Sequence, residues 1–246
     1  MSSDKKILAV MPVYNEELVI EDNIKKIAKY FKNNFSNWQI AIADNASSDK
    51  TGQISKRLES EVKNLKYFFI RERGRGGALK KTFLQFDADF YIYMDIDLAV
   101  DLNCVAGLIE AANNGYDMAI GSRFLKESRV QRSLKREISS RIYKTLARLI
   151  LKTNISDFQC GFKLISKKVR DQVLPLCIDT GFFWDTEIIC LTEAMGYKTK
   201  EIPVDWSDYR NEKRKSTVNV LATAIDYLKK IRELRNRASK LSKKQK

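Results

Sequence analysis

The amino-acid sequence predicts an α/β protein whose mostly parallel sheet is flanked by helices. Short apolar runs rich in β-forming residues alternate with segments of helical periodicity over the first half of the chain, which is the pattern of successive β-α-β units. A polar motif follows five of these apolar runs. Because ligands bind at the carboxyl ends of parallel strands, we expect these motifs to form one site.

The expected strands and helices alternate along the chain. The apolar runs predict strands over residues 7–13, 39–43, 67–70, 90–94 and 118–120. The intervening segments predict helices over residues 16–31, 49–62, 77–86 and 102–113. The regular alternation stops after Arg123, where a polar, basic stretch precedes a helix expected over residues 141–152. That last helix has basic flanks, so it suits either the core or a membrane surface.

The positive charge is concentrated at the C-terminus. Residues 213–246 hold twelve Lys or Arg and two acidic residues, a net charge of +10, which leaves +4 of the total +14 for residues 1–212. Apolar residues recur at helical spacing from Val218 to Ile231, whereas residues 237–246 are almost entirely polar. We therefore expect a basic amphipathic helix and a tail without fixed structure over residues 213–246. Such a region favours an anionic partner, either nucleic acid or an acidic membrane face.

The composition excludes several kinds of site. The chain has no histidine, which rules out a Ser-His-Asp triad, a zinc ion held by histidine and a histidine general base. The four cysteines are widely spaced and form no CxxC pair. No apolar run approaches the roughly 18–20 residues that span a bilayer, and no cleavage-type site follows the first apolar run. These features predict a cytoplasmic protein with reduced thiols.

Two aspartates, Asp95 and Asp97, stand where the apolar run 90–94 ends. Unpaired carboxylates are costly to bury, so this pair either forms a turn that caps the next helix or meets a cation. Carboxylate oxygens are the ligands that Mg²⁺ and Mn²⁺ prefer. The pair is therefore a candidate metal site.

A glycine-rich stretch at residues 74–77 follows another expected strand. It offers backbone N–H groups to a phosphate, with Arg73, Arg75 and Lys80 as possible partners. Its glycine spacing is not GxGxxG, and the chain contains no GxxxxGK[ST]. The sequence therefore argues against a dinucleotide-binding enzyme and against a P-loop protein.

Seven motifs occur in the order and spacing typical of family 2 glycosyltransferases: MPVYNEE, ADNASSDKTG, RGRGGA, MDIDLA, GSRF, DFQCGFKLI and WDTEII. The resemblance covers roughly residues 5–210 and is greatest to the dolichyl-phosphate glucose and mannose synthases and their prokaryotic relatives. It implies a GT-A catalytic domain over residues 1–212, a UDP- or GDP-sugar donor and Mg²⁺ or Mn²⁺. It also implies inverting transfer of a hexose to a polyprenyl (dolichyl) phosphate.

The resemblance assigns the donor and the metal to particular residues. The positions that match the nucleotide-sugar site are Pro12, Tyr14, Glu16, Asp44, Arg73, Gly76 and Asp95. Asp95 and Asp97 resemble the metal-binding DxD pair, with Asp97 the first choice of ligand. Ala99 cannot ligate where some mannosyl relatives have a ligand, which favours glucose over mannose. Helix capping is the structural alternative for Asp44 and Asp49, and it is the preferred interpretation for Asp49.

The resemblance places the acceptor phosphate at Arg123, Arg136 and Ser140. A guanidinium binds phosphate through two parallel hydrogen bonds and keeps its charge, although a solvated basic loop would have the same composition. Arg123 is also expected to be catalytic, together with Asp157 and Asp185, which would lie near the sugar. For Asp185, stabilisation of a helix N-terminus is the alternative.

The expected enzyme is a cytoplasmic hexosyltransferase that associates peripherally with an anionic membrane through residues 141–152 and the C-terminal helix. A basic segment at residues 213–215 is a candidate loop over the diphosphate. An alternative enzyme would use the same donor with a sugar or protein hydroxyl as acceptor, and Asp157 or Asp185 would then act as a base. A non-catalytic nucleic-acid binder would leave the ordered motifs unexplained, and no specific nucleic acid is expected.

Overall fold

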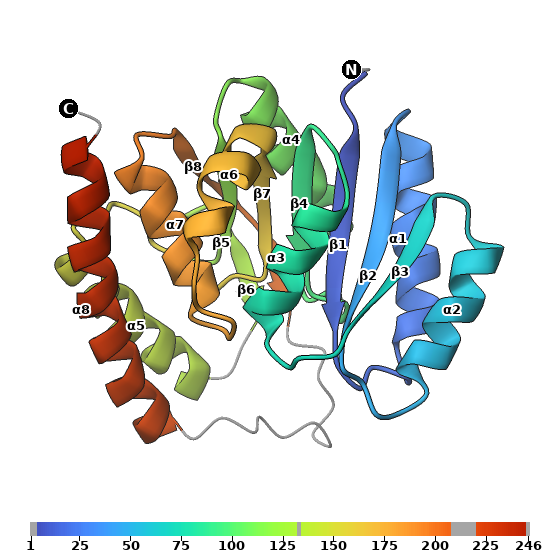
Figure 1. Cartoon of the computed structure of the whole chain (residues 1–246), viewed down its shortest axis with the longest axis horizontal. Helices are drawn as coiled ribbons and strands as arrows, with labels where there is room; N and C mark the ends of the chain where they lie inside the picture. Colours follow the sequence, from blue (N-terminus) through green and yellow to red (C-terminus); the bar gives the residue numbers. More distant parts are fainter. Residues whose placement is uncertain (1–3, 132–133, 208–219, 245–246) are drawn as a thin grey trace.

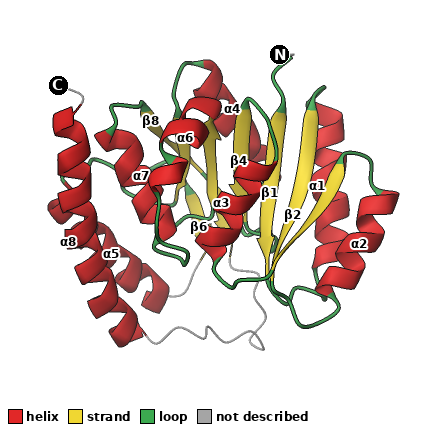
Figure 2. Ribbon diagram, viewed as in Figure 1, coloured by secondary structure: helices red, strands yellow, loops and turns green. Residues whose placement is uncertain are grey.

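The structure is a computed structural model that describes the backbone of residues 4–131, 134–207 and 220–244, and the side chains of these ranges except 134–136, 220–225 and 244. Within these ranges seven strands form one sheet in the order β3-β2-β1-β4-β7-β5-β8, and β6 pairs with β9 beside it. Helices cover both faces of the large sheet (Figures 1 and 2). The predicted α/β class is confirmed.

The first half of the chain alternates as expected. Its elements are β1 (Ile7–Val13), α1 (Ile20–Asn34), β2 (Trp38–Asn45), α2 (Thr51–Glu61), β3 (Leu65–Ile70), α3 (Arg75–Gln85), β4 (Phe90–Met94), the 3-10 turn η1 (Leu102–Cys104), α4 (Val105–Asn113) and β5 (Met118–Ser122). Strand β1 lies between β2 and β4 and is parallel to both. The five predicted strands are therefore present, with ends shifted by at most two residues.

In the second half, two helices lie in segments that were expected to be helical: α5 (Leu134–Leu151), where residues 141–152 were expected, and α8 (Val220–Lys244), within residues 213–246. The sequence pattern did not predict the other elements, which are β6 (Arg129–Gln131), β7 (Phe162–Ser166), α6 (Lys167–Gln172), η2 (Leu174–Leu176), α7 (Trp184–Ala194), β8 (Thr199–Pro203) and β9 (Asp205–Ser207). Strand β7 runs antiparallel between β4 and β5. Its second residue is the fully buried Lys163, and a lysine inside so short an apolar run hides the strand from a hydrophobicity pattern.

Two apolar layers hold the sheet between its helices. One layer joins the sheet to α1, α2 and α4 through residues such as Ile24 and Leu108. The other joins it to α3, α6 and α7 through residues such as Phe83 and Ile188. Every residue of β4 is buried, as expected for a strand covered on both faces. The sheet is therefore a rigid platform for the loops at its ends.

The C-terminal helix α8 packs against α5 and α7, and these helices lie together at one side of the molecule in Figure 1. Ile231 and Leu234 are each 1% exposed. Farther along, Arg237 donates hydrogen bonds to the buried Glu187 and to a backbone carbonyl of η2. The expectation of an unstructured tail over residues 237–246 is therefore wrong as far as Lys244, because these residues continue a helix whose apolar stripe is buried.

No helix within the described ranges combines the length and apolar character needed to cross a membrane. The expected boundary between residues 212 and 213 falls in the segment 208–219, outside the described residues. The four cysteines, which all lie within the described ranges, are free thiols, as expected.

Candidate active site

The expected donor residues lie at the carboxyl ends of β1, β2, β3 and β4, which are neighbours in the sheet. Tyr14 follows β1, Asp44 is the last residue but one of β2, Arg73 follows β3 and Asp95 follows β4. The register pairs Val13 with Asp44. The fold therefore gathers at one edge four side chains that are far apart in the sequence.

The ends of β1 and β3 meet through an aromatic and a cationic side chain. The Arg73 guanidinium lies 4.5 Å from the centre of the Tyr14 ring and donates a hydrogen bond to the Tyr14 hydroxyl. Tyr14 is 38% exposed, so one side of this pair faces solvent. A flat, partly exposed pair of this kind can stack against a nucleobase.

Asp44 is almost fully buried beside this pair, at 1% exposure. Its carboxylate accepts hydrogen bonds from the Tyr67 hydroxyl at 2.8 Å and from the Ser47 backbone at 2.9 Å. Burial and the Asp44 carboxylate raise the pKa of Tyr67, so this phenol stays protonated and continues to donate. Asp44 closes a turn rather than capping α2. Tyr67 was not singled out from the sequence, because nothing in its local pattern marks a partner 23 residues away.

The loops after β1 and β2 are joined by hydrogen bonds. The Glu16 backbone N–H donates to the Thr51 hydroxyl at 2.7 Å. Asp49 accepts from the backbone N–H groups of Thr51 at 2.9 Å and Glu17 at 3.2 Å, so it satisfies the first N–H of α2 from the position before the N-cap residue, Lys50. Pro12 is half-buried in β1. Pro12 thus belongs to β1 and Glu16 is joined to the start of α2, and contact of either residue with a donor stays a prediction.

Arg75 joins two carboxylates at the centre of the site. Its guanidinium donates from Nη2 to Asp95 Oδ1 at 2.8 Å and from Nη1 to Asp185 Oδ2 at 2.6 Å. Behind it, Lys163 Nζ donates to Asp185 Oδ1 at 2.6 Å, and the Tyr93 hydroxyl donates to the same carboxylate. The side chains of Asp185 and Lys163 are 5% and 0% exposed, whereas that of Asp95 is 41% exposed.

The ion pairs decide the charge state of the buried carboxylate. Burial raises the pKa of Asp185, but the charges of Lys163 and Arg75 lower it by more, and the result is a pKa below the ordinary range. Burial and Asp185 raise the pKa of Tyr93 well above its usual value. Lys163, Asp185, Arg75 and Asp95 therefore form a row of alternating charge that ends at the half-exposed carboxylate.

Two glycines make this arrangement possible. A Cβ atom on Gly161 would lie 2.1 Å from Asp95 Oδ2, and a Cβ atom on Gly76 would lie 2.3 Å from the Cβ atom of Trp184. Gly161 thus leaves room for the Asp95 carboxylate, and Gly76 lets the start of α3 approach the start of α7. In this structure Gly76 contacts Trp184, so it contributes to the site by placing Arg75.

Arg123 and Asp157 form a second buried ion pair. Arg123 donates to Asp157 from Nε at 2.7 Å, from Nη2 at 2.9 Å and from its backbone N–H at 3.0 Å. The backbone N–H groups of Gln159 and Cys160 donate to the same carboxylate. Burial raises the pKa of Asp157, and Arg123 lowers it by more. Asp157 is thus an ionised structural partner of Arg123.

The remaining expected residues are placed as follows. Ser140 is half-buried on α5. The side chain of Arg136 and the segment 213–215 lie outside the described residues. Lys80, a possible phosphate partner, donates to the backbone carbonyls of Pro175 and Cys177 at 3.1 and 2.7 Å, which ties it to the loop before α7.

The residues near Asp95 and Asp97 suit a cation that is held by one or two carboxylates and takes its other ligands from phosphate and water. Within the described ranges no three acidic, cysteine or histidine side chains cluster as a complete metal site. Leu98 adopts a left-handed φ of 52°, and Asp97 Oδ1 accepts from the Ala99 N–H at 3.2 Å, so both aspartates stand on one tight turn. Mg²⁺ commonly uses one or two carboxylates together with phosphate oxygens and water. The residues present fit that arrangement.

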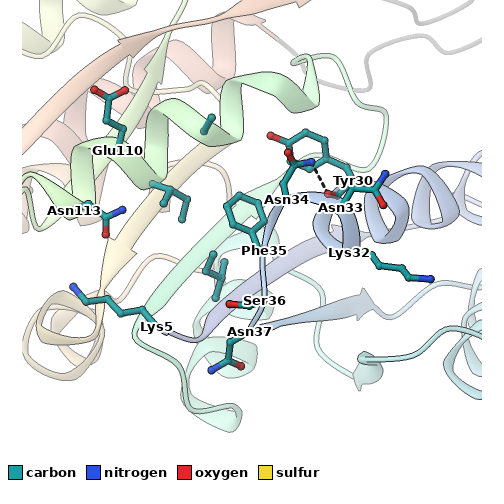
Figure 3. Close-up of a pocket in the computed structure, with 13 residues that line it drawn as sticks. Lys5, Tyr30, Lys32, Asn33, Asn34, Phe35, Ser36, Asn37, Glu110 and Asn113 are labelled. Atoms are coloured by element: carbon teal, nitrogen blue, oxygen red, sulfur yellow. Dashed lines mark hydrogen bonds between the residues drawn. The ribbon is translucent and has the colours of Figure 1, made fainter. Parts of the chain in front are cut away.

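A hollow of about 640 Å³ lies at the other end of the sheet. It is lined by the end of α1, by α4 and by the residues that lead into β1 and β2, among them Lys5, Phe35 and Asn37 (Figure 3). Ligands of open α/β sheets bind at the carboxyl ends of the strands. The candidate active site is therefore the smaller, more polar region around Asp95.

Comparison with known proteins gives the family of the chain. The family model described as glycosyl transferase family 2 matches residues 8–174. Glycosyltransferase AglD of Haloferax volcanii is 33% identical over 205 residues, which cover 82% of this chain and 33% of that protein. The chain thus spans only about a third of AglD. Dolichyl-phosphate beta-glucosyltransferase of Saccharomyces cerevisiae is 29% identical over 249 residues, covering 92% of this chain and 72% of that protein.

A solved structure shares the fold. Glucosyl-3-phosphoglycerate synthase of Mycobacterium tuberculosis, solved with Mn²⁺, UDP and phosphoglyceric acid, superposes with a TM-score of 0.67 at 13% identity, over 95% of this chain and 78% of that one. This likeness confirms the expected GT-A architecture. Because the family model spans well over half of the sequence, the protein belongs to glycosyl transferase family 2.

Proposed function

We propose that the protein transfers a hexose, glucose ahead of mannose, from a nucleoside-diphosphate sugar to a polyprenyl phosphate of the dolichyl type. Family membership supports the sugar transfer. The names of the relatives in Saccharomyces cerevisiae and Dictyostelium discoideum, both dolichyl-phosphate beta-glucosyltransferases, support the acceptor and the sugar. The observation that carries the proposal is the state of Asp157 and Asp185.

Both carboxylates that could serve as a general base are held in buried ion pairs. Asp157 is paired with Arg123, and Asp185 with Lys163 and Arg75. Their lowered pKa values make them weak bases near pH 7. A sugar or protein hydroxyl must lose a proton to attack, whereas a phosphate monoester is already an oxyanion. The geometry therefore favours a phosphate acceptor over a hydroxyl acceptor.

The donor would bind across the ends of β1 to β4. Tyr14, Arg73 and Asp44 would hold the nucleoside, and Asp95 with Asp97 would hold Mg²⁺ or Mn²⁺ on the diphosphate. A bound cation neutralises charge that develops on the leaving diphosphate. The Mn²⁺ and UDP present in the structural relative support UDP over GDP as the nucleotide.

Helix α5 is the candidate for contact with the cytoplasmic face of an anionic membrane. Its residues Ile138, Ile142 and Leu149 are 59%, 58% and 70% exposed, at spacings that place them on one side of the helix. Arg141 and Lys144 lie between them in the sequence. Each basic residue near an anionic surface contributes about 1 kcal/mol of attraction. In α8, Ile231 and Leu234 are each 1% exposed, so we choose α5 as the attachment helix.

A transfer assay tests the acceptor. The full chain is incubated in detergent with radiolabelled UDP-glucose and Mn²⁺, and with either a polyprenyl phosphate or the matching polyprenol. We expect labelled lipid only with the phosphate, and the acid-labile bond of a glycosyl phosphate in the product. Equal or greater transfer to the polyprenol would contradict the phosphate acceptor. GDP-mannose in place of UDP-glucose decides between the two donors.

Vesicle binding tests the attachment helix. With vesicles that contain phosphatidylserine, we expect Ile142→Asp to weaken sedimentation at least about five-fold. The matched control is Leu84→Asp, since Leu84 is also exposed, at 45%, but lies on α3. Equal sedimentation of the two variants and the wild type would rule out α5 as the contact.

A further inference from the structure

In the row of alternating charge at the site, the positively charged Arg75 side chain is paired with Asp95, which is a proposed metal ligand. Asp95 Oδ1 accepts from Arg75 Nη2 at 2.8 Å. The Arg75 side chain is 12% exposed and that of Asp95 is 41% exposed, so water screens this contact from the Asp95 side only. A divalent cation that reaches Asp95 alone would meet a carboxylate that is already neutralised, with a guanidinium close by.

The guanidinium is anchored on its inner side. Arg75 Nη1 donates to Asp185 Oδ2 at 2.6 Å, and Asp185 is fixed in turn by Lys163 and Tyr93. The guanidinium also lies 5.5 Å from the centre of the Tyr93 ring. Arg75 therefore has a fixed inner nitrogen, and its outer nitrogen bonds a carboxylate that is partly open to solvent.

The cation and the diphosphate change the charge of this region in opposite directions. A cation adds positive charge beside Arg75, which repels it, and a diphosphate adds negative charge, which Arg75 attracts. When both bind together, the charge of the diphosphate offsets the charge of the cation next to Arg75. When the cation binds alone, its repulsion by Arg75 is not offset. A charged group that opposes one ligand and favours the other creates a coupling between them, and such coupling is reciprocal.

We propose that Arg75 is a positioning residue that makes divalent-cation binding at Asp95 conditional on the nucleoside diphosphate. Arg75 pairs with Asp95 when the site holds no donor and so disfavours the cation alone. The diphosphate offsets the charge of Arg75, so the divalent cation binds more tightly at Asp95. This inference rests on the proposed donor site and adds an order of binding to it.

Titration of Mn²⁺, followed by the electron paramagnetic resonance of the free ion, tests this role without an activity measurement. The titration is made with and without saturating UDP on the wild type, on Arg75→Gln and on Arg71→Gln. Arg71 is an exposed residue just after β3, so its variant has the same change in net charge. Circular dichroism melts establish that each variant is folded.

We expect Arg75→Gln to bind Mn²⁺ alone at least about ten-fold tighter than the wild type, because a like charge next to the cation is removed. The factor by which UDP tightens Mn²⁺ binding should fall by a similar amount. Arg71→Gln should match the wild type in both. Arg75→Lys keeps the charge but cannot bridge both carboxylates, so intermediate values are expected.

The outcomes separate this inference from the proposed function. If Arg75→Gln has wild-type affinity for Mn²⁺ alone and the wild-type effect of UDP, the role of Arg75 is wrong while the donor site stands. If Arg75→Gln does not fold, wild-type values in Arg75→Lys overturn the inference in the same way. If the wild type binds no Mn²⁺ even with UDP, the proposed donor site itself fails, and the inference fails with it.

Discussion

The Arg123–Asp157 pair allows a quantitative test of the view that Asp157 is a structural partner rather than a base. Asp157 is 1% exposed, and its carboxylate accepts five hydrogen bonds, from three groups of Arg123 and from the backbone of Gln159 and Cys160. Asp157→Asn keeps the shape of the side chain but replaces one acceptor oxygen with a donor and removes the charge.

The expected loss of stability follows from what remains after the substitution. The Arg123 side chain is 13% exposed, so its charge stays largely buried without a counter-ion. Removal of one partner of a buried ion pair costs about 3–5 kcal/mol. For a chain of this length about 1 kcal/mol lowers the melting temperature by roughly 2–4 °C. We therefore expect the melting temperature to fall by roughly 6–20 °C.

Calorimetry and urea unfolding at pH 7 measure this loss, with Asp87→Asn as the matched control. Asp87 is paired with Lys167 at the surface, where the side chains are 69% and 46% exposed, and such a pair contributes less than about 1 kcal/mol. A double-mutant cycle with Arg123→Met isolates the pair itself. A loss below about 1 kcal/mol for Asp157→Asn, or strictly additive effects in the cycle, would refute the reasoning.

The same pair predicts a pH dependence. The pKa of Asp157 is lower in the folded protein than its ordinary value, because Arg123 outweighs the effect of burial. Its charge therefore stabilises the fold above the unfolded-state pKa of about 3.9, and this contribution is lost as the pH falls through the folded-state pKa. The stability difference between wild type and Asp157→Asn should be constant near neutral pH and shrink below about pH 4.

Two other substitutions test the centre of the site. Gly161→Ala places a Cβ atom 2.1 Å from Asp95 Oδ2, so the carboxylate must move. We expect the affinity for UDP with Mn²⁺, measured by calorimetry, to weaken about ten-fold or more. Unchanged affinity would show that Asp95 need not stay in this position. Lys163→Met removes the charge that lowers the pKa of Asp185 most. We expect the free energy of unfolding in urea to fall by about 3 kcal/mol and acid unfolding to occur at a higher pH. An unchanged acid transition would count against this pairing.

The strands, and the gathering of the polar motifs at their carboxyl ends, could be predicted because both depend on local sequence; the donor role of these residues came from the family resemblance and stays a prediction. The five predicted strands are apolar runs bounded by polar motifs, and parallel pairing then brings Tyr14, Asp44 and Asp95 to one edge. The helix over residues 237–244 was not predicted, because its stability comes from α7 and from Glu187 and not from its own composition. Strand β7 was missed because Lys163 interrupts it, and the buried lysine is explained by its bonds to the Cys160 carbonyl and to Asp185, 22 residues later.

The double role of Arg75 could not be predicted from its motif. The glycine-rich stretch marked it as one of three possible phosphate partners, and all three stand in the same kind of sequence. The structure separates them by their partners: Lys80 bonds backbone carbonyls, Arg73 lies on Tyr14, and Arg75 bridges two carboxylates. Partners up to 110 positions away decide which role each residue has.

The antiparallel strand β7 has a consequence for how the chain folds. Strands β4 and β5 follow one another along the chain, but in the large sheet β7 lies between them. Strand β7 follows β5 in the sequence by about 40 residues. Strands β1 to β4 can pair as soon as they are synthesised, whereas β5 and β8 are joined to them only through β7. Loop closure over such distances is slow. The sheet should therefore assemble as a β1–β4 half that forms early and a β5–β8 half whose docking waits for residues 162–166, and a nascent chain that ends before β7 should expose the unpaired edge of β4.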